Sequence, residues 1–83
     1  MAFELTQHAQ KVLAERGILM EWVELTLSAP ELRLPDPADT AVERCYRKIP
    51  EHGGRVLRVA VNNTVEPARI VSAFFDRKMK GKV

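Results

Sequence analysis

The second half of the chain contains three segments in which apolar and polar residues alternate, and the connections between these segments are short. The segments are residues 42–49, 55–62 and 68–75, and alternation with a period of two is typical of β-strands. Proline, glycine and asparagine are concentrated in the connections at 50–54 and 62–67. A crossover between parallel strands needs about a dozen residues or more, so these connections predict an antiparallel meander.

The first half of the chain has the periodicity of two short helices. Thr6 has the chemistry of an N-cap, and Gly17 is placed to end the helix that follows it. The apolar stripe of this first helix consists of Ala9, Val12 and Leu13. A second helix is predicted from about residue 20 to residue 28, ending before Pro30 because the residue that precedes a proline is pushed out of helical geometry.

These elements predict a single α+β domain. A chain of 83 residues hides only about 60 to 65% of its unfolded surface, which excludes two independent cores. We therefore expect residues 1–83 to form one domain in which two N-terminal helices pack on one face of a small antiparallel meander sheet. Residues 1–30 are predicted to be mainly helical, 31–75 to form the sheet and 76–83 to form a basic tail. Residues 3–5 and 31–34 are candidates for further short strands.

Charge is divided unevenly along the chain. Residues 1–43 contain three basic and eight acidic side chains, whereas residues 44–83 contain ten basic and three acidic ones. The first part therefore has a net charge of −5 and the second a net charge of +7. Such an asymmetry indicates an anionic partner for the basic part, typically a nucleic acid.

Several classes of protein are excluded by what the sequence lacks. Cys45 is the single cysteine, so no intrachain disulfide can form and a secreted disulfide-built domain is excluded. The N-terminus has no signal-peptide pattern and no apolar run reaches membrane-spanning length, so we predict a cytoplasmic location and no membrane partner. Two histidines and one cysteine do not supply a zinc site, and a glycine-rich phosphate loop is absent; we expect no metal and no cofactor.

Four residues on the predicted strands form a candidate RNA-contact surface. Arg44, Tyr46 and Lys48 share one face of their strand, and Arg58 on the neighbouring strand joins them if the open faces align. Cations neutralise phosphate, and an aromatic ring stacks on an unpaired base. Such a set could also cleave RNA without a metal, if a base deprotonates the ribose 2′-hydroxyl while the cations stabilise the charge on the phosphate. The alternative is that these are the solvated side chains of any half-buried sheet.

The two histidines have both a functional and a structural interpretation. His8 lies near the start of the first predicted helix, where an imidazole could act as acid or base near neutrality. A capping or packing histidine is the alternative for this position. His52 lies beside two glycines in a loop and is interpreted as a solvated turn residue.

Two more surfaces are candidates for binding. The C-terminal run that contains Arg77 and Lys78 is either an anion-binding tail or a solubilising one. Trp22, with Leu19 and Leu25, forms either a partner surface, since tryptophan is enriched among interface anchors, or part of the core.

Short runs along most of the chain carry a resemblance to a known family. They are LTQHA at 5–9, ERGI at 15–18, GRVLRV at 54–59 and IVSAFFDR at 70–77, together with Val23, Leu27 and Pro30. With these runs the chain resembles a widespread bacterial family of unknown function, the domain numbered 4258. That family is similar in layout to the BrnT and RelE/ParE-type toxins of bacterial toxin–antitoxin pairs. The resemblance implies a RelE/ParE-like fold and a small metal-free ribonuclease, or an inert relative, that a protein partner neutralises.

The resemblance also singles out individual residues. His8, Arg16, Arg58 and Ser72 fall on the recurrent pattern of the family. The chain departs from that pattern at Lys11, where arginine is more frequent, and at Ser72, where threonine is common. Both departures keep the type of chemistry.

Two hypotheses about function follow. The first is a toxin-like RNA-binding domain, with or without metal-free endoribonuclease activity. Its catalytic candidates are His8, Tyr46 and Arg58, and its RNA-binding candidates are Arg16, Arg44, Lys48, Ser72, Arg77 and Lys78. The alternative is a non-catalytic interaction module in which the Trp22 helix binds an antitoxin-like protein or a second copy of the chain.

Overall fold

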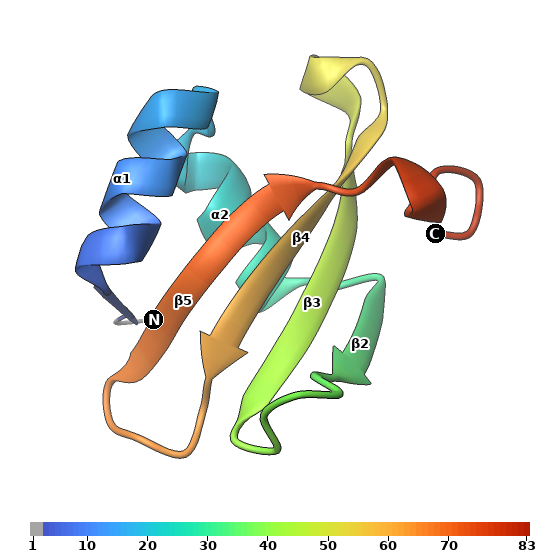
Figure 1. Cartoon of the computed structure of the whole chain (residues 1–83). Helices are drawn as coiled ribbons and strands as arrows, with labels where there is room; N and C mark the ends of the chain where they lie inside the picture. The colour runs from blue at the N-terminus through green and yellow to red at the C-terminus, as the bar shows by residue number, and fades with distance from the viewer. Residues whose placement is uncertain (1–2) are drawn as a thin grey trace.

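Two helices cover one face of a five-stranded sheet in the computed structural model, which describes residues 3–83 (Figure 1). The elements in chain order are β1 (Phe3–Leu5), α1 (Gln7–Arg16), α2 (Met20–Ser28), β2 (Leu32–Pro35), β3 (Val42–Ile49), β4 (Arg55–Asn62) and β5 (Ala68–Phe75). Two 3₁₀ turns, η1 (Pro50–His52) and η2 (Arg77–Met79), follow β3 and β5. The predicted α+β class is confirmed, and β3, β4 and β5 have the predicted bounds.

The sheet is mixed rather than wholly antiparallel. Its order is β1-β5-β4-β3-β2, and the strands from β2 to β5 form the predicted antiparallel meander. β1 lies at the edge and runs parallel to β5, with Phe3 opposite Ala68 and Leu5 opposite Ile70. The prediction is therefore corrected at this edge. Most of the chain separates β1 from β5, which permits parallel pairing, and a strand of three residues carries no signal of direction.

The predicted cap residues begin and end α1. The Thr6 hydroxyl accepts the N–H of Ala9 at 3.0 Å and donates to the carbonyl of Val71 at 3.3 Å, so the same side chain also fastens α1 to β5. Gly17 ends the helix in the left-handed conformation, with φ of 62°. The buried residues of α1 are the predicted stripe, Ala9, Val12 and Leu13.

The core lies between the two helices and one face of the sheet. Ala9, Val23, Leu57, Val59 and Ile70 belong to this core and are 0% exposed. Successive strand residues point to opposite faces, so β4 sends Leu57 and Val59 toward the helices. The intervening β4 residues point to the other face of the sheet, which we call the open face.

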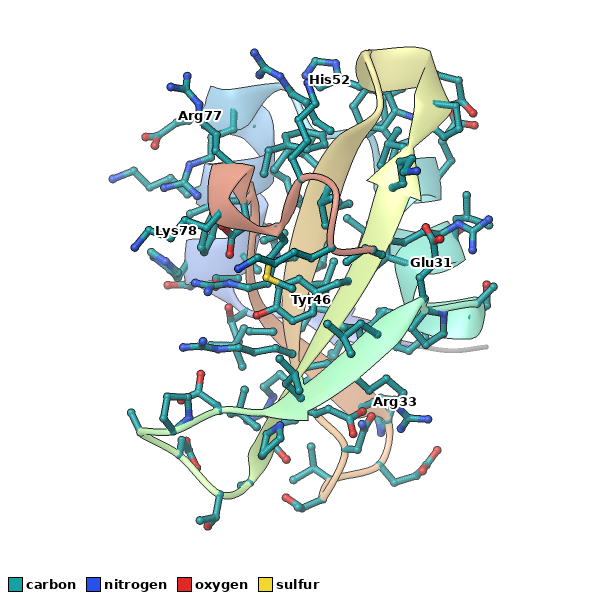
Figure 2. All side chains as sticks on the ribbon, turned by 90° about the vertical axis from the view of Figure 1, so that its right-hand side faces the viewer. Glu31, Arg33, Tyr46, His52, Arg77 and Lys78 are labelled. Carbon is teal, nitrogen blue, oxygen red and sulfur yellow. The ribbon has the colours of Figure 1, made fainter. Side chains whose placement is uncertain are left out.

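The residues after β5 fold back over one end of the open face. The N–H of Asp76 donates to the carbonyl of Val56 at 2.8 Å, and η2 contacts β4. Figure 2 views the molecule from the side of β2 and shows the C-terminal segment passing beside Tyr46. Residues 76–83 are basic, as predicted, but they form part of the folded structure instead of a free tail.

Candidate functional site

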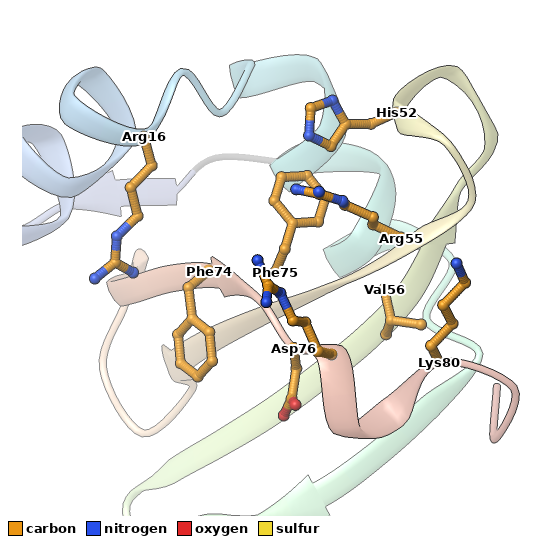
Figure 3. A pocket seen from close by; sticks show the side chains of 9 residues that line it. Arg16, His52, Arg55, Val56, Phe74, Phe75, Asp76 and Lys80 are labelled. Atoms are coloured by element: carbon orange, nitrogen blue, oxygen red, sulfur yellow. The ribbon is translucent and has the colours of Figure 1, made fainter.

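A pocket with a volume of about 770 Å³ lies where α1, η1, β4 and β5 meet the C-terminal segment (Figure 3). Its lining residues are Arg16 from α1, His52 from η1, Arg55 and Val56 from β4, Phe74 and Phe75 from β5, and Asp76, Arg77 and Lys80 from the segment that follows. We call it the basic pocket. Its volume falls within the range of about 300 to 1,000 Å³ that is typical of ligand sites.

The charge of the basic pocket is uncompensated. Arg16, Arg55, Arg77 and Lys80 are exposed, and none of them forms an ion pair within residues 3–83. Asp76 is the carboxylate of the lining, and it pairs with Arg58 at 3.6 Å. Cations gathered without acidic partners produce a positive potential that attracts anions.

An aromatic cluster forms one side of the basic pocket. The rings of His52 and Phe75 stack with centroids 4.6 Å apart and an angle of 26° between their planes, and Trp22 lies 5.2 Å from His52. The indole N–H of Trp22 donates to Glu51 at 2.9 Å, which holds η1 and therefore His52 in place. His52 is half-buried in this cluster, so its interpretation as a solvated turn residue is corrected.

Arg16 reaches from the end of α1 across β5. Its guanidinium donates to the carbonyl of Ala73 at 3.1 Å, and its Cζ lies 5.7 Å from the centroid of the Phe74 ring. Arg58 contacts the same ring more closely, with Cζ 3.8 Å from the centroid. Both distances are within the range of cation–π interactions. Phe74 therefore connects the basic pocket to the open face.

Most of the residues that build the basic pocket fall within a segment that matches a known family. Residues 5–75 match the family model described as Domain of unknown function (DUF4258). The chain belongs to this family. No curated protein and no solved structure matches the chain. The predicted membership of the DUF4258 family is confirmed, and the likeness to BrnT and RelE/ParE-type toxins stays a prediction.

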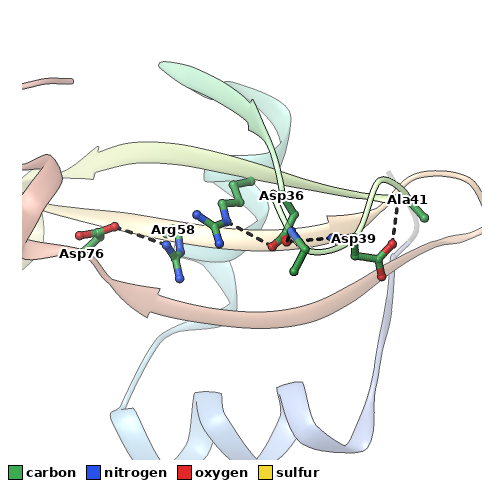
Figure 4. Close-up of polar contacts among 7 residues, drawn as sticks. Asp36, Asp39, Ala41, Arg58 and Asp76 are labelled. Atoms are coloured by element: carbon green, nitrogen blue, oxygen red, sulfur yellow. Dashed lines mark hydrogen bonds and ion pairs between the residues drawn. The ribbon is translucent and has the colours of Figure 1, made fainter.

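The open face of this DUF4258 domain holds the predicted set of Arg44, Tyr46, Lys48 and Arg58. Two of its cations already have acidic partners, because Arg44 pairs with Asp36 at 3.2 Å and Arg58 pairs with Asp76 at 3.6 Å (Figure 4). Tyr46 is 3% exposed, so its ring is not available to stack on a base. The expectation of a free phosphate-binding set is corrected here, since acids outside the alternating pattern neutralise both arginines.

His8 does not join the open face. It is exposed on α1, next to the buried Ala9, and α1 packs on the opposite face of the sheet from Arg58. The sheet therefore lies between His8 and the residues it was predicted to assist. We assign His8 no part in proton transfer with them.

The remaining predicted RNA contacts are divided between two places. Arg16 and Arg77 line the basic pocket, whereas Ser72 and Lys78 do not. Ser72 is half-buried on the open face opposite Ala60, and Lys78 is exposed on η2. Two of these predicted residues thus meet in one site.

The structure supports the second of the two interpretations of Trp22, as part of the core, and a partner surface that includes Leu19 and Leu25 stays a prediction. Trp22 is 8% exposed and belongs to the core, where its ring meets Phe75 edge-on with centroids 6.0 Å apart. Leu19 and Leu25 are exposed on the same stretch of chain, at 46% and 36%. A tryptophan that the core already covers cannot anchor a partner.

Seven of the nine residues that line the basic pocket were not predicted from the sequence, namely His52, Arg55, Val56, Phe74, Phe75, Asp76 and Lys80. A signal for all of them except Lys80 exists in the predicted hairpin. In the antiparallel pair Leu57 lies opposite Phe75, so residues just before Leu57 and just after β5 must be neighbours. The position of Lys80 depends on the turn after β5, which no periodicity describes.

Residues 3–83 include no group of histidine, cysteine, aspartate and glutamate side chains that could hold a metal ion. Within the same residues, no helix is long and apolar enough to cross a membrane.

Proposed function

We propose that this DUF4258 domain binds single-stranded RNA in the basic pocket. The observation that carries the proposal is the convergence of four cations without acidic partners on an aromatic cluster. Cationic side chains neutralise the phosphates of RNA, and unpaired bases stack on aromatic side chains and guanidinium planes. A compact recess fits a flexible single strand better than a rigid duplex.

The resemblance to the BrnT and RelE/ParE-type toxins supports RNA as the anion. In that reading the domain is toxin-like and has an antitoxin-like protein as its partner. The net charge of +7 in residues 44–83, which supply three of the four pocket cations, agrees with an anionic ligand.

The first test measures RNA affinity after the charge of the pocket is reversed. The double variant Arg55→Glu/Arg77→Glu changes two exposed cations of the lining, and fluorescence anisotropy with a short labelled single strand reports binding. We expect affinity to fall about tenfold or more, because two phosphate contacts become repulsive. The matched control is Lys48→Glu/Lys82→Glu, which reverses two exposed cations outside the lining and should keep affinity within about threefold. Equal losses in both variants would exclude the pocket as the site, and no binding by the unmodified chain would exclude RNA binding itself.

Metal-free cleavage of RNA is a second candidate function, favoured by the position of His52. This imidazole lines the pocket beside the cations and could remove the proton of a ribose 2′-hydroxyl. The 2′-oxygen would then attack phosphorus and the bond from phosphorus to O5′ would break. The products are a 2′,3′-cyclic phosphate and, after O5′ takes a proton, a 5′-hydroxyl. The nearby cations would stabilise the charge on the phosphate.

The test of cleavage compares the two histidines. RNA incubated with the chain in the presence of a chelator should yield 2′,3′-cyclic phosphate ends, and His52→Gln should reduce the rate about a hundredfold or more while anisotropy still detects binding. His8→Gln is the matched control and should leave the rate unchanged. If His8→Gln abolishes cleavage and His52→Gln does not, His52 is not the base. If the unmodified chain gives no cyclic ends, the domain binds RNA without cutting it.

A further inference from the structure

Arg58 is held by two contacts at the border between the open face and the basic pocket. Its Cζ lies 3.8 Å from the centroid of the Phe74 ring, and its Nη1 lies 3.6 Å from Oδ2 of Asp76. The side chains of Arg58 and Asp76 are only 21% and 13% exposed. A pair that is shielded to this degree is screened by salt much less than a surface pair.

Asp76 uses its polar groups to fix the turn that follows β5. Its N–H donates to the carbonyl of Val56 at 2.8 Å, its Oδ1 accepts the N–H of Lys78 at 3.0 Å, and its carbonyl accepts the N–H of Met79 at 3.3 Å. The other carboxylate oxygen, Oδ2, faces Arg58 (Figure 4). The side chain of Asp76 therefore joins β4 to η2 through Arg58.

The residues that this turn presents belong to the basic pocket. Arg77 is the first residue of η2, and its carbonyl accepts the N–H of Lys80 at 3.3 Å. Both side chains line the pocket, as does Phe74, the other residue that Arg58 contacts. The contacts of Arg58 thus lead to four lining residues, Asp76 among them, although Arg58 itself does not line the pocket.

We infer that Arg58 is a positioning residue, which orients Asp76 and Phe74 so that Arg77, Lys80 and the Phe74 ring form the basic pocket. Arg58 does not contact RNA in this arrangement, since its guanidinium is engaged by a carboxylate and a ring. This role replaces the catalytic role expected from the sequence. It rests on the proposed function only for the identity of the ligand; the ordering of η2 is independent of any ligand.

Because Asp76 is negatively charged, a positioning role and a purely electrostatic role predict opposite changes in RNA affinity when it is replaced. Asp76 is a carboxylate in the lining of an anion site, so by charge alone Asp76→Ala should tighten RNA binding. A positioning role predicts the opposite. Loss of the side chain releases η2 and moves Arg77 and Lys80, which weakens RNA binding. The expected loss is about fivefold, a typical effect of coupling between residues in contact. Arg58→Gln should weaken binding by a similar factor, and the double variant should be little weaker than either single variant.

Hydrogen exchange provides a readout that needs no RNA. In Arg58→Gln the amide of Lys78 should exchange at least about fivefold faster, because the acceptor carboxylate is no longer held. Arg58→Lys keeps a cation facing Asp76 and Phe74 and should restore both slow exchange and binding. Arg44→Gln is the matched control, because it breaks another ion pair of the open face, with similar side-chain exposure at 26% and 18%, and should leave exchange in η2 unchanged.

Tighter RNA binding by Asp76→Ala, or unchanged exchange in Arg58→Gln, would overturn the positioning role. If the unmodified chain binds no RNA, the proposed function fails and the exchange measurement alone decides the role of Arg58. If Arg58→Gln unfolds the chain, as circular dichroism would show, the comparison of Arg58→Lys with Asp76→Ala decides it by the same two readouts.

Discussion

At the scale of single residues, the positions of the carboxylates decide which cations can meet a ligand. Asp36 accepts the N–H of Ala38 at 2.8 Å and the Nε of Arg44 at 3.2 Å. The amide of Ala38, and then Arg44, keep the pKa of Asp36 below its ordinary value, so the carboxylate is charged at neutral pH. The alternation of the strand predicted the face of Arg44 correctly. It could not predict the partner, because the loop that places Asp36 has no periodicity.

Cys45 shows how a residue's surroundings set its reactivity. The strand pattern placed its thiol toward the core, and Cys45 is 3% exposed. Burial raises the pKa of the thiol to about 11, and the neighbouring Glu43 adds to the effect. Because the thiolate is the reactive form, we expect iodoacetamide at pH 8 to label the folded chain about a hundredfold more slowly than the chain in urea. Because the chain has a single cysteine, mass spectrometry of the intact chain measures the labelling rate of Cys45 without ambiguity. Equal labelling rates in both states would show that the thiol is accessible.

At the scale of elements, the sequence predicted what depends on local periodicity. The cap at Thr6, the end of α1 at Gly17 and the alternation of β3, β4 and β5 are local signals, and each corresponds to an observed element. The parallel pairing of β1 with β5 is set by residues far apart in the chain, and no local signal encodes it.

The candidate site depends on the ends of elements, which is why the sequence predicted only part of it. Arg16 ends α1, Arg55 begins β4 and Phe75 ends β5, while η1 and η2 contribute His52 and Arg77. The sequence gives the chemical type of each of these residues, but it does not show that they lie close together. Their meeting at one point requires the crossing of α1 over β5 and the return of the C-terminal segment. Arg16 and Arg77 were predicted as RNA contacts from the resemblance and from the basic run, respectively, and not from this geometry.

At the scale of the whole molecule, folding rearranges the uneven charge of the sequence. Acids of the first part pair with cations of the second, as in Glu4 with Arg69 at 3.8 Å and Asp36 with Arg44 at 3.2 Å. The net charges of −5 and +7 therefore overstate the polarity of the folded molecule. What is left unpaired includes the four cations of the basic pocket.

This concentration of charge predicts how RNA binding should depend on salt. Each phosphate neutralised on a single strand contributes about −0.7 to the slope of log K against log salt concentration. Contacts from the four pocket cations therefore give a slope of about −2.8, whereas all ten basic side chains of residues 44–83 would give about −7. Anisotropy titrations of the unmodified chain at several sodium chloride concentrations measure the slope. Arg55→Glu/Arg77→Glu should reduce its magnitude to about half, since two of the contacts are lost. A slope near −7 would assign binding to the whole basic part of the chain, and a slope near zero would show that the pocket cations do not meet phosphate.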